Sequence, residues 1–275
     1  MVHTFAQVKV KSQRSEGLVN AELRDNGLLV SDGDSKVPVK IGRPPFCPFH
    51  HLNETEIKRL PGDVLNGGVF SGTAVIVHTG DNKILLTRRA SHLKLFPGVL
   101  VPPGGHIEGN ETIVESGIRE LREETGITLR QSDFVDSRLP ILALWESTFP
   151  PKLSLGLSTH HHIVVFILAK LLPSITSQKL QKQMDLNPAE VGASAWLDRQ
   201  MVEAITSASG ENRPYGNDHK TLPQKIKAIL VTENKEQILT DLPTAPLLET
   251  SSDAVDIKRV CTGTKFVLEE WLKVT

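Results

Sequence analysis

Short runs in the middle of the chain alternate between apolar and polar residues, which is the pattern of half-buried β-strands. Thr79-Gly-Asp-Asn82 supplies turn residues between two such runs and predicts a hairpin. The run that begins at His160 alternates at first and then becomes wholly apolar, as a central strand does. The strands predicted in this way are 5–10, 27–30, 71–78, 83–88, 134–145, 160–171 and 187–197.

A helical periodicity follows residue 110. Asn110 or Glu111 is expected to open this helix, and Gly126 to end it in a left-handed conformation. The same reasoning predicts helices over 201–208 and 223–236, a loop over 209–223, a linker over 242–253, and a strand or a helix over 263–274. The apolar residues that recur at helical spacing and should face a sheet are Ile113, Val114, Gly117, Ile118 and Leu121.

The predicted elements divide the chain into a central domain and two extensions. A chain of 275 residues is long enough to bury a full core. Residues 66–208 hold most of the predicted strands and are expected to form the main domain, with an N-terminal extension over 1–65 and a C-terminal extension over 209–275. In the first extension, Cys47, His50 and His51 resemble metal ligands, but a structural zinc site needs four, so a small packed extension is expected instead.

The composition is that of a soluble globular protein, with 39% hydrophobic and 23% charged residues. A net charge of −1 provides no overall basic field to attract a polyanion, although a local patch would suffice for RNA. Neither a signal peptide nor an apolar run of membrane-spanning length is present, so no membrane partner is expected. Two distant cysteines argue against a disulfide framework and favour an intracellular, cytoplasmic location. No feature of the sequence favours one oligomeric state.

Three acidic residues, Glu120, Glu123 and Glu124, share one face of the helix that follows residue 110. Carboxylates so close repel one another unless a cation neutralises them. Hard oxygen ligands of this kind suit Mg²⁺ or Mn²⁺. A solvated acidic helix face is the alternative interpretation of a Glu-Glu pair.

The wider pattern around these acids favours the metal site. The stretch 105–127 has glycine, acidic, arginine and bulky aliphatic residues at nine fixed positions of one pattern. The residues at these positions are Gly105, Glu111, Arg119, Glu120, Leu121, Glu123, Glu124, Gly126 and Ile127. The stretch 105–127 thereby resembles the signature box of the Nudix hydrolases. The resemblance implies an α+β fold, a mixed β-sheet sandwiched between helices (α/β/α), with the box as a loop-helix-loop.

The resemblance also implies a reaction and roles for the box residues. Nudix hydrolases generally cleave a diphosphate that links a nucleoside to another group, with a divalent cation that neutralises phosphoryl charge and positions or acidifies water. Glu120 and Glu124 are expected to bind the cation, with Glu123 as a third ligand. Glu120 and Glu123 are also candidate catalytic residues. Arg119 would pair with Glu111 and orient the helix, while Gly105 and Gly126 shape the ends of the box.

The proton acceptor is not fixed by the box. Glu146 follows Trp145 near the end of a predicted strand and is the main candidate outside the box. Glu190 is a weaker candidate of the same kind. The alternative for each is a solvated loop acid.

The segment Leu85–Gly98 bears on the substrate. It resembles the stretch with which some Nudix relatives recognise coenzyme A, but it departs from that pattern at Lys94 and Pro102. Its Arg88 and Arg89 are predicted to contact phosphate, or else to solvate a strand end.

The whole chain resembles a vertebrate branch of the family that hydrolyses the methylated guanosine cap of messenger RNA. The resemblance implies mRNA decapping with release of m7GDP, and a nucleotide or capped-RNA substrate. Cap recognition needs aromatic rings, of which Trp145 and Phe149 are the best placed and Tyr215 is the sole tyrosine. The alternative for Trp145 is a partly buried core residue, which is the more common role of such a tryptophan. The trio His160, His161 and His162 leads a strand and is expected to be structural.

Two other functions stay open. The same chemistry could act on coenzyme A, a nucleotide sugar or a dinucleoside polyphosphate. A Nudix-fold module that binds nucleotides without catalysis is the alternative of another class, and the intact set of box acids disfavours it.

Overall fold

The computed structural model describes residues 16–24, 27–31, 38–44, 69–136, 138–150, 153–156, 160–208, 222–248 and 260–275, with Cys47, Thr55, Arg59 and Gly62 between them. The chain forms two compact units. Unit 1 comprises Met1–Ala74, Gly105–Gly117 and Ile141–Ile167, and unit 2 comprises Val75–Gly104, Ile118–Pro140 and Leu168–Thr275. This division does not follow sequence order, and the expected domain bounds near residues 65 and 208 stay a prediction.

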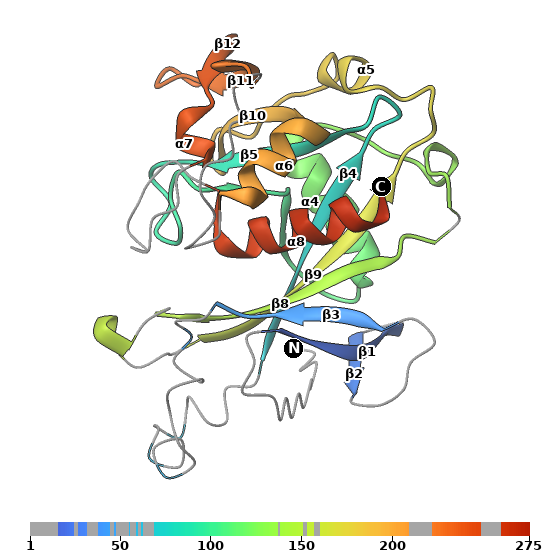
Figure 1. The fold of residues 1–275 in the computed structure, drawn as a ribbon, viewed down its shortest axis with the longest axis vertical. Coiled ribbons are helices and arrows are strands. Elements are labelled where there is room, and N and C mark those ends of the chain that lie inside the picture. Colours follow the sequence, from blue (N-terminus) through green and yellow to red (C-terminus); the bar gives the residue numbers. More distant parts are fainter. Residues whose placement is uncertain are drawn as a thin grey trace. The chain divides into compact units, whose positions relative to one another are not determined.

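Unit 1 is built on strands, which succeed one another in the order β4-β9-β8-β3-β1-β2 (Figure 1). Neighbours β8 and β9 are antiparallel, whereas β3 runs parallel to β8, so the sheet is mixed as expected. The strands with residues in this unit are β1 (Glu16–Arg24), β2 (Gly27–Ser31), β3 (Val39–Gly42), β4 (Phe70–His78), β7 (Gly104–His106), β8 (Ile141–Phe149) and β9 (His160–Lys170).

In unit 2 the strands follow the order β12-β11-β10-β5-β4, and β6 pairs with the C-terminal end of β5. Ala195 of β10 lies opposite Leu86 of β5, and both side chains are buried. The additional strands are β5 (Lys83–Arg89), β6 (Leu100–Val101), β10 (Val191–Asp198), β11 (Lys225–Val231) and β12 (Gln237–Pro243).

The helices pack their apolar sides inward. Within unit 2, α6 lies against α8, where Val267 and Trp271 are buried, and the orange and red ribbons of Figure 1 run close together. The Asp198 carboxylate accepts a hydrogen bond from the Met201 amide and so begins α6. The helices whose bounds the structure describes are α4 (Ile113–Thr125), α5 (Ser177–Gln181), α6 (Arg199–Ser207), α7 (Ala245–Leu248) and α8 (Thr262–Val274), with 3-10 turns at Gln131–Asp133 and Leu153–Leu155.

The expected hairpin β4–β5, the central strand β9 and helix α6 are confirmed, and the open choice over 263–274 is settled as a helix. The helix expected over 223–236 is wrong, because this segment forms β11 and the turn into β12. The 242–253 linker contains the end of β12 and α7. The strand expected from residue 134 begins at Ile141 instead, after Pro140.

Several expectations fall outside the described residues, namely the strand over 5–10, most of the 209–223 loop, His50, His51 and Tyr215. Cys47 and Cys261 are both free thiols. Among the described residues, no helix has the length and apolar character needed to span a membrane.

Candidate active site

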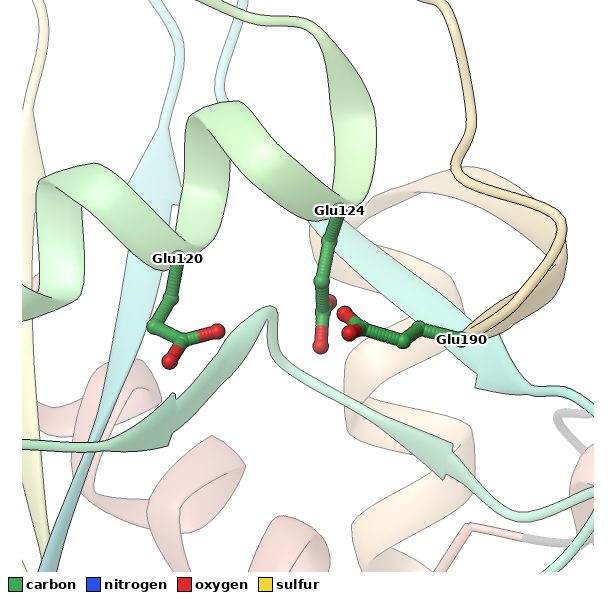
Figure 2. Close-up of side chains that lie close together, drawn as sticks. All are labelled: Glu120, Glu124 and Glu190. Atoms are coloured by element: carbon green, nitrogen blue, oxygen red, sulfur yellow. The ribbon is translucent and has the colours of Figure 1, made fainter.

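Helix α4 presents two carboxylates in the same direction. Glu120 and Glu124 are four residues apart, so they project from one side of the helix, as Figure 2 shows. Gly126 follows the helix with φ +73°, and its amide donates to the Arg122 carbonyl at 2.8 Å. This is the left-handed helix end that the sequence predicted for Gly126.

The segment 185–190 brings a third carboxylate to the same place. It is fastened to the end of α4, because the Asp185 amide donates to the Thr125 carbonyl and the Asn187 amide to the Glu124 carbonyl, at 2.9 and 3.0 Å. The Glu190 carbonyl in turn accepts from the Ala90 amide at 2.8 Å, which anchors it beside β5. The Glu190 side chain therefore points at Glu124 and Glu120 (Figure 2).

One oxygen from each of Glu120, Glu124 and Glu190 lies within 4.8 Å of the others. We call these three residues the acid cluster. Glu124 is buried, Glu120 is partly buried and Glu190 is exposed, so the cluster opens from the interior to the surface. The three side chains lie at the distance at which a single cation can contact all of them.

The electrostatics of the acid cluster favour such a cation. Burial, reinforced by the negative charge of Glu190, raises the pKa of Glu124 to about 8. Burial also raises the pKa of Glu120, against the opposing effect of Arg119. Proteins shift carboxyl pKa values in this direction when the charged form lacks full compensation, and a bound divalent cation would supply that compensation.

Strand β5 lines the cluster with a hydroxyl and a guanidinium. The Thr87 hydroxyl lies 3.3 Å from a Glu124 oxygen, and the positive charge of Arg89 lowers the pKa of Glu124. Residues 87 and 89 share one face of the strand, since successive side chains alternate. Alternation places Arg88 on the opposite face, where burial lowers its pKa.

The acid cluster fits Mg²⁺ or Mn²⁺. It offers only carboxylate oxygens, the hard ligands that these ions prefer, and neither sulfur nor imidazole belongs to the set. Burial is the main cause of the raised pKa of its most buried member, Glu124. The donor set and the electrostatics thus both suit a divalent cation.

Glu123, expected as a third ligand, is placed differently. One of its oxygens lies 2.9 Å from Arg119 Nη1 and the other 3.9 Å from Arg122 Nη2, and it is not in the acid cluster. Arg119 Nη1 also donates to Glu120 at 3.0 Å, so this guanidinium positions a cluster carboxylate. The expected pair between Arg119 and Glu111 joins residues of different units and stays a prediction. Glu111 and Gly105 both lie in unit 1.

Unit 1 holds the remaining candidates, Glu146 and Trp145, on β8. Glu146 is buried between an arginine and a histidine side chain. Arg43 Nη2 lies 2.7 Å from its Oε2, and His161 Nε2 lies 2.7 Å from its Oε1. Trp145 is 9% exposed, so it has little ring surface to offer a ligand. Both side chains are thus engaged within unit 1. The roles expected for them, proton acceptor for Glu146 and stacking ring for Trp145, stay predictions.

Sequence reasoning did not recognise Glu190 as a partner of Glu120 and Glu124. It named Glu190 only as a weak candidate for the proton acceptor. Glu190 lies 66 positions after Glu124 in the chain, and no helical spacing links them. The available signal was the Asn187-Pro188 pair at the start of the predicted strand 187–197, because a turn at a strand start can present a side chain towards a neighbouring element.

The chain is similar to several known proteins. A NUDIX domain profile matches residues 70–216. The chain is 42% identical over 267 residues to the m7GpppN-mRNA hydrolase NUDT17 of Danio rerio, covering 96% of this chain and 87% of that protein. It is 36% identical to the Xenopus laevis protein of that name, over 94% and 84% of the two chains. It is 41% identical to the Homo sapiens protein, over 93% and 77%.

Proposed function

Because this chain belongs to the Nudix hydrolase family, we propose that it is a divalent-metal-dependent pyrophosphohydrolase that removes the methylguanosine cap of messenger RNA. Water would add across the phosphoanhydride, which breaks to leave m7GDP and an RNA with a 5′ monophosphate. The observation that carries this proposal is the acid cluster, whose oxygens lie within 4.8 Å of one another.

The residues of unit 2 have separate tasks in this proposal. Glu120, Glu124 and Glu190 would hold Mg²⁺ or Mn²⁺, which when bound neutralises phosphate charge and acidifies a water molecule. Arg119 holds the Glu120 carboxylate in place at 3.0 Å. Arg89, whose charge already acts on Glu124, is the phosphate contact on the same face of β5.

We assign the third ligand to Glu190 rather than to Glu123. The Glu123 side chain is 46% exposed and paired with arginine, whereas Glu190 meets the other two acids directly. For the proton acceptor, Glu146 stays the candidate outside the cluster. Both of its oxygens are engaged, by Arg43 and His161, so proton transfer through Glu146 requires one of these contacts to open.

The choice of capped RNA rests on the curated relatives, which are m7GpppN-mRNA hydrolases and align with almost the whole chain. We place the activity in an intracellular compartment, which two free thiols support. Coenzyme A is the competing substrate, since Arg88 and Arg89 lie in the stretch that resembles a coenzyme A motif.

A substrate panel tests the proposal. The protein is given methyl-capped RNA, unmethylated capped RNA, coenzyme A and a nucleotide sugar, each with Mg²⁺ or Mn²⁺, and products are separated by chromatography. We expect m7GDP from methyl-capped RNA as the main product. Cleavage of coenzyme A alone would overturn the assignment and would make the 85–98 stretch the determinant of specificity.

A matched pair of variants links that activity to the acid cluster. Glu120→Gln should lower kcat by about two orders of magnitude or more, because it removes a metal ligand with little change in shape. Glu203→Gln removes a half-exposed carboxylate of α6, outside the cluster, and should leave kcat unchanged. Equal activity of both variants would show that the cluster does not hold the catalytic ion.

A further inference from the structure

Four rings meet in unit 1, outside the acid cluster. Phe70 of β4 lies 5.9 Å from His160 and 5.6 Å from His162 of β9, between ring centroids. The two imidazoles are stacked, 6.1 Å apart and inclined by 15°. His106 meets His162 edge to face at 6.3 Å. We call Phe70, His106, His160 and His162 the ring cluster.

The strands explain why these rings share one face. His160 and His162 are two residues apart, so they leave the same side of β9, and β4 is its neighbour. His161 points to the other side, where it binds Glu146. The histidine trio, expected to be structural, is therefore divided: one member supports the buried carboxylate and two face Phe70.

The ring cluster is open to solvent. Phe70 is 46% exposed, and His106 and His160 are also exposed, while His162 is partly buried among them. An exposed aromatic face of this kind can accept a flat ligand without rearrangement of the core. Trp145, one of the two rings that the sequence named for stacking, is only 9% exposed.

The chemistry of the ring cluster suits an uncharged, flat partner. Burial and the neighbouring imidazoles lower the pKa of His162 to about 4, so this ring is neutral at pH 7. The histidines are not among the groups of the described residues whose ligand atoms lie within 4.8 Å, so their geometry does not favour a shared metal ion. Their ring edges can still donate and accept hydrogen bonds.

We propose that the ring cluster is a stacking surface for a nucleobase of the RNA substrate. Base stacking on aromatic rings tolerates any sequence, and imidazole edges reach the hydrogen-bonding edges of a base. His106 follows Gly105 of the Nudix box, so the surface includes the strand that leads into the metal-binding helix. The inference takes its ligand, single-stranded RNA, from the proposed function.

Binding of RNA without cleavage tests this site. The full-length protein, kept in EDTA, is titrated with a 5′-hydroxyl hexaadenylate and with an abasic ribose phosphate chain of the same length. Phe70→Leu should weaken binding of hexaadenylate about tenfold, since it removes a stacking ring but keeps an apolar side chain. Binding of the abasic chain, which has no base to stack, should be the same for both proteins.

Leu239→Ala is the control, because Leu239 is 62% exposed and lies on β12 of unit 2, outside the stretch 85–98. It should leave the affinity for hexaadenylate unchanged. Equal losses in the two variants, or a loss that also appears with the abasic chain, would overturn the stacking surface. So would stoichiometric Zn²⁺ binding that disappears in His160→Gln and His162→Gln, which would make the histidines a metal site.

The result can be separated from the proposed function. With metal and capped RNA, Phe70→Leu should raise KM for long capped RNA and leave kcat within about twofold. If capped RNA is not cleaved but hexaadenylate binding depends on Phe70, the stacking surface stands and the decapping assignment fails. If capped RNA is cleaved and neither Kd nor KM responds to Phe70→Leu, the stacking surface fails and decapping stands.

Discussion

The burial of Glu124 determines how the protein responds to pH. Its carboxylate lies beside Glu190 and Glu120, and the Thr87 hydroxyl at 3.3 Å compensates its charge only in part. The same position next to other oxygens is what makes it useful as a metal ligand. The charge of Glu124 therefore lowers the stability of the metal-free protein, although the same charge is needed to bind the metal.

The metal-free protein should become less stable as the pH rises. The pKa of Glu124 is about 8 in the folded state against an ordinary value of 4.5, so the folded state keeps a proton that the unfolded chain has released. Stability from this group is thus greatest below pH 4.5 and falls until about pH 8. Between pH 6 and 8 the loss should be about 2 kcal/mol.

Thermal melts in EDTA across this range check the sign, with Glu124→Gln as the reference that cannot ionise. The difference in Tm between the two proteins should shift in favour of the variant as the pH rises. Mg²⁺ or Mn²⁺ should stabilise the unmodified protein more at pH 8 than at pH 6, because the cation competes with the proton. A difference in Tm that does not vary with pH would show that Glu124 is not desolvated as described.

The individual residues show where sequence information ends. Glu120 and Glu124 could be paired from their spacing alone, because a helix fixes which side chains are neighbours. The same rule also brought in Glu123, and it could not tell that Arg119 and Arg122 pair with that carboxylate. The position of Glu190 depends on hydrogen bonds between backbone groups that are far apart in the chain. A local sequence pattern cannot predict such bonds.

The junction after helix α4 connects local backbone geometry to the site. Gly126 has φ +73°, and a Cβ atom there would lie 2.9 Å from the Asp185 amide nitrogen. That amide is fixed by its bond to Thr125, so it cannot retreat easily. The close approach is also what brings the segment with Glu190 to the end of α4.

Gly126→Ala should therefore destabilise the protein by about 2–4 kcal/mol, from the left-handed backbone and the clash together. Gly109→Ala is the control, because Gly109 has φ +55° but no atom within 4 Å of the added Cβ, and should lose about 1 kcal/mol. Urea unfolding curves measure both. Similar losses would mean that the contact with Asp185 contributes nothing.

At the level of helices and strands, prediction succeeded where the local pattern and the tertiary environment agree. β9 is apolar on both faces and lies between β4 and β8, so its sequence and its place coincide. The helix predicted over 223–236 is wrong because strand pairing outweighed the local preference for a helix. Ala228 lies opposite Ala195 of β10 and is buried, whereas Lys225 and Lys227 are exposed, which is the alternation of a strand.

Across the whole molecule, the proposed metal site and the proposed RNA contacts belong to different units. The acid cluster, Arg119 and Arg89 all lie in unit 2, whereas the ring cluster lies in unit 1, as does Glu146, the candidate proton acceptor. Variants of the acid cluster should act on metal affinity and kcat, and variants of the ring cluster on RNA affinity. The signature box contributes to both units, since Gly105 and Glu111 belong to unit 1 and Glu120 and Glu124 to unit 2.

The identity of the third ligand is the most direct test of the acid cluster as the seat of the catalytic ion. The measurement is the Mn²⁺ concentration that gives half-maximal release of m7GDP from capped RNA, for the unmodified protein, Glu190→Gln and Glu123→Gln. Glu190→Gln should raise this concentration about tenfold or more, because a ligand is lost. Glu123→Gln should change it by less than about threefold, since a half-exposed ion pair contributes little. The opposite order would contradict the cluster and would return the third ligand to Glu123.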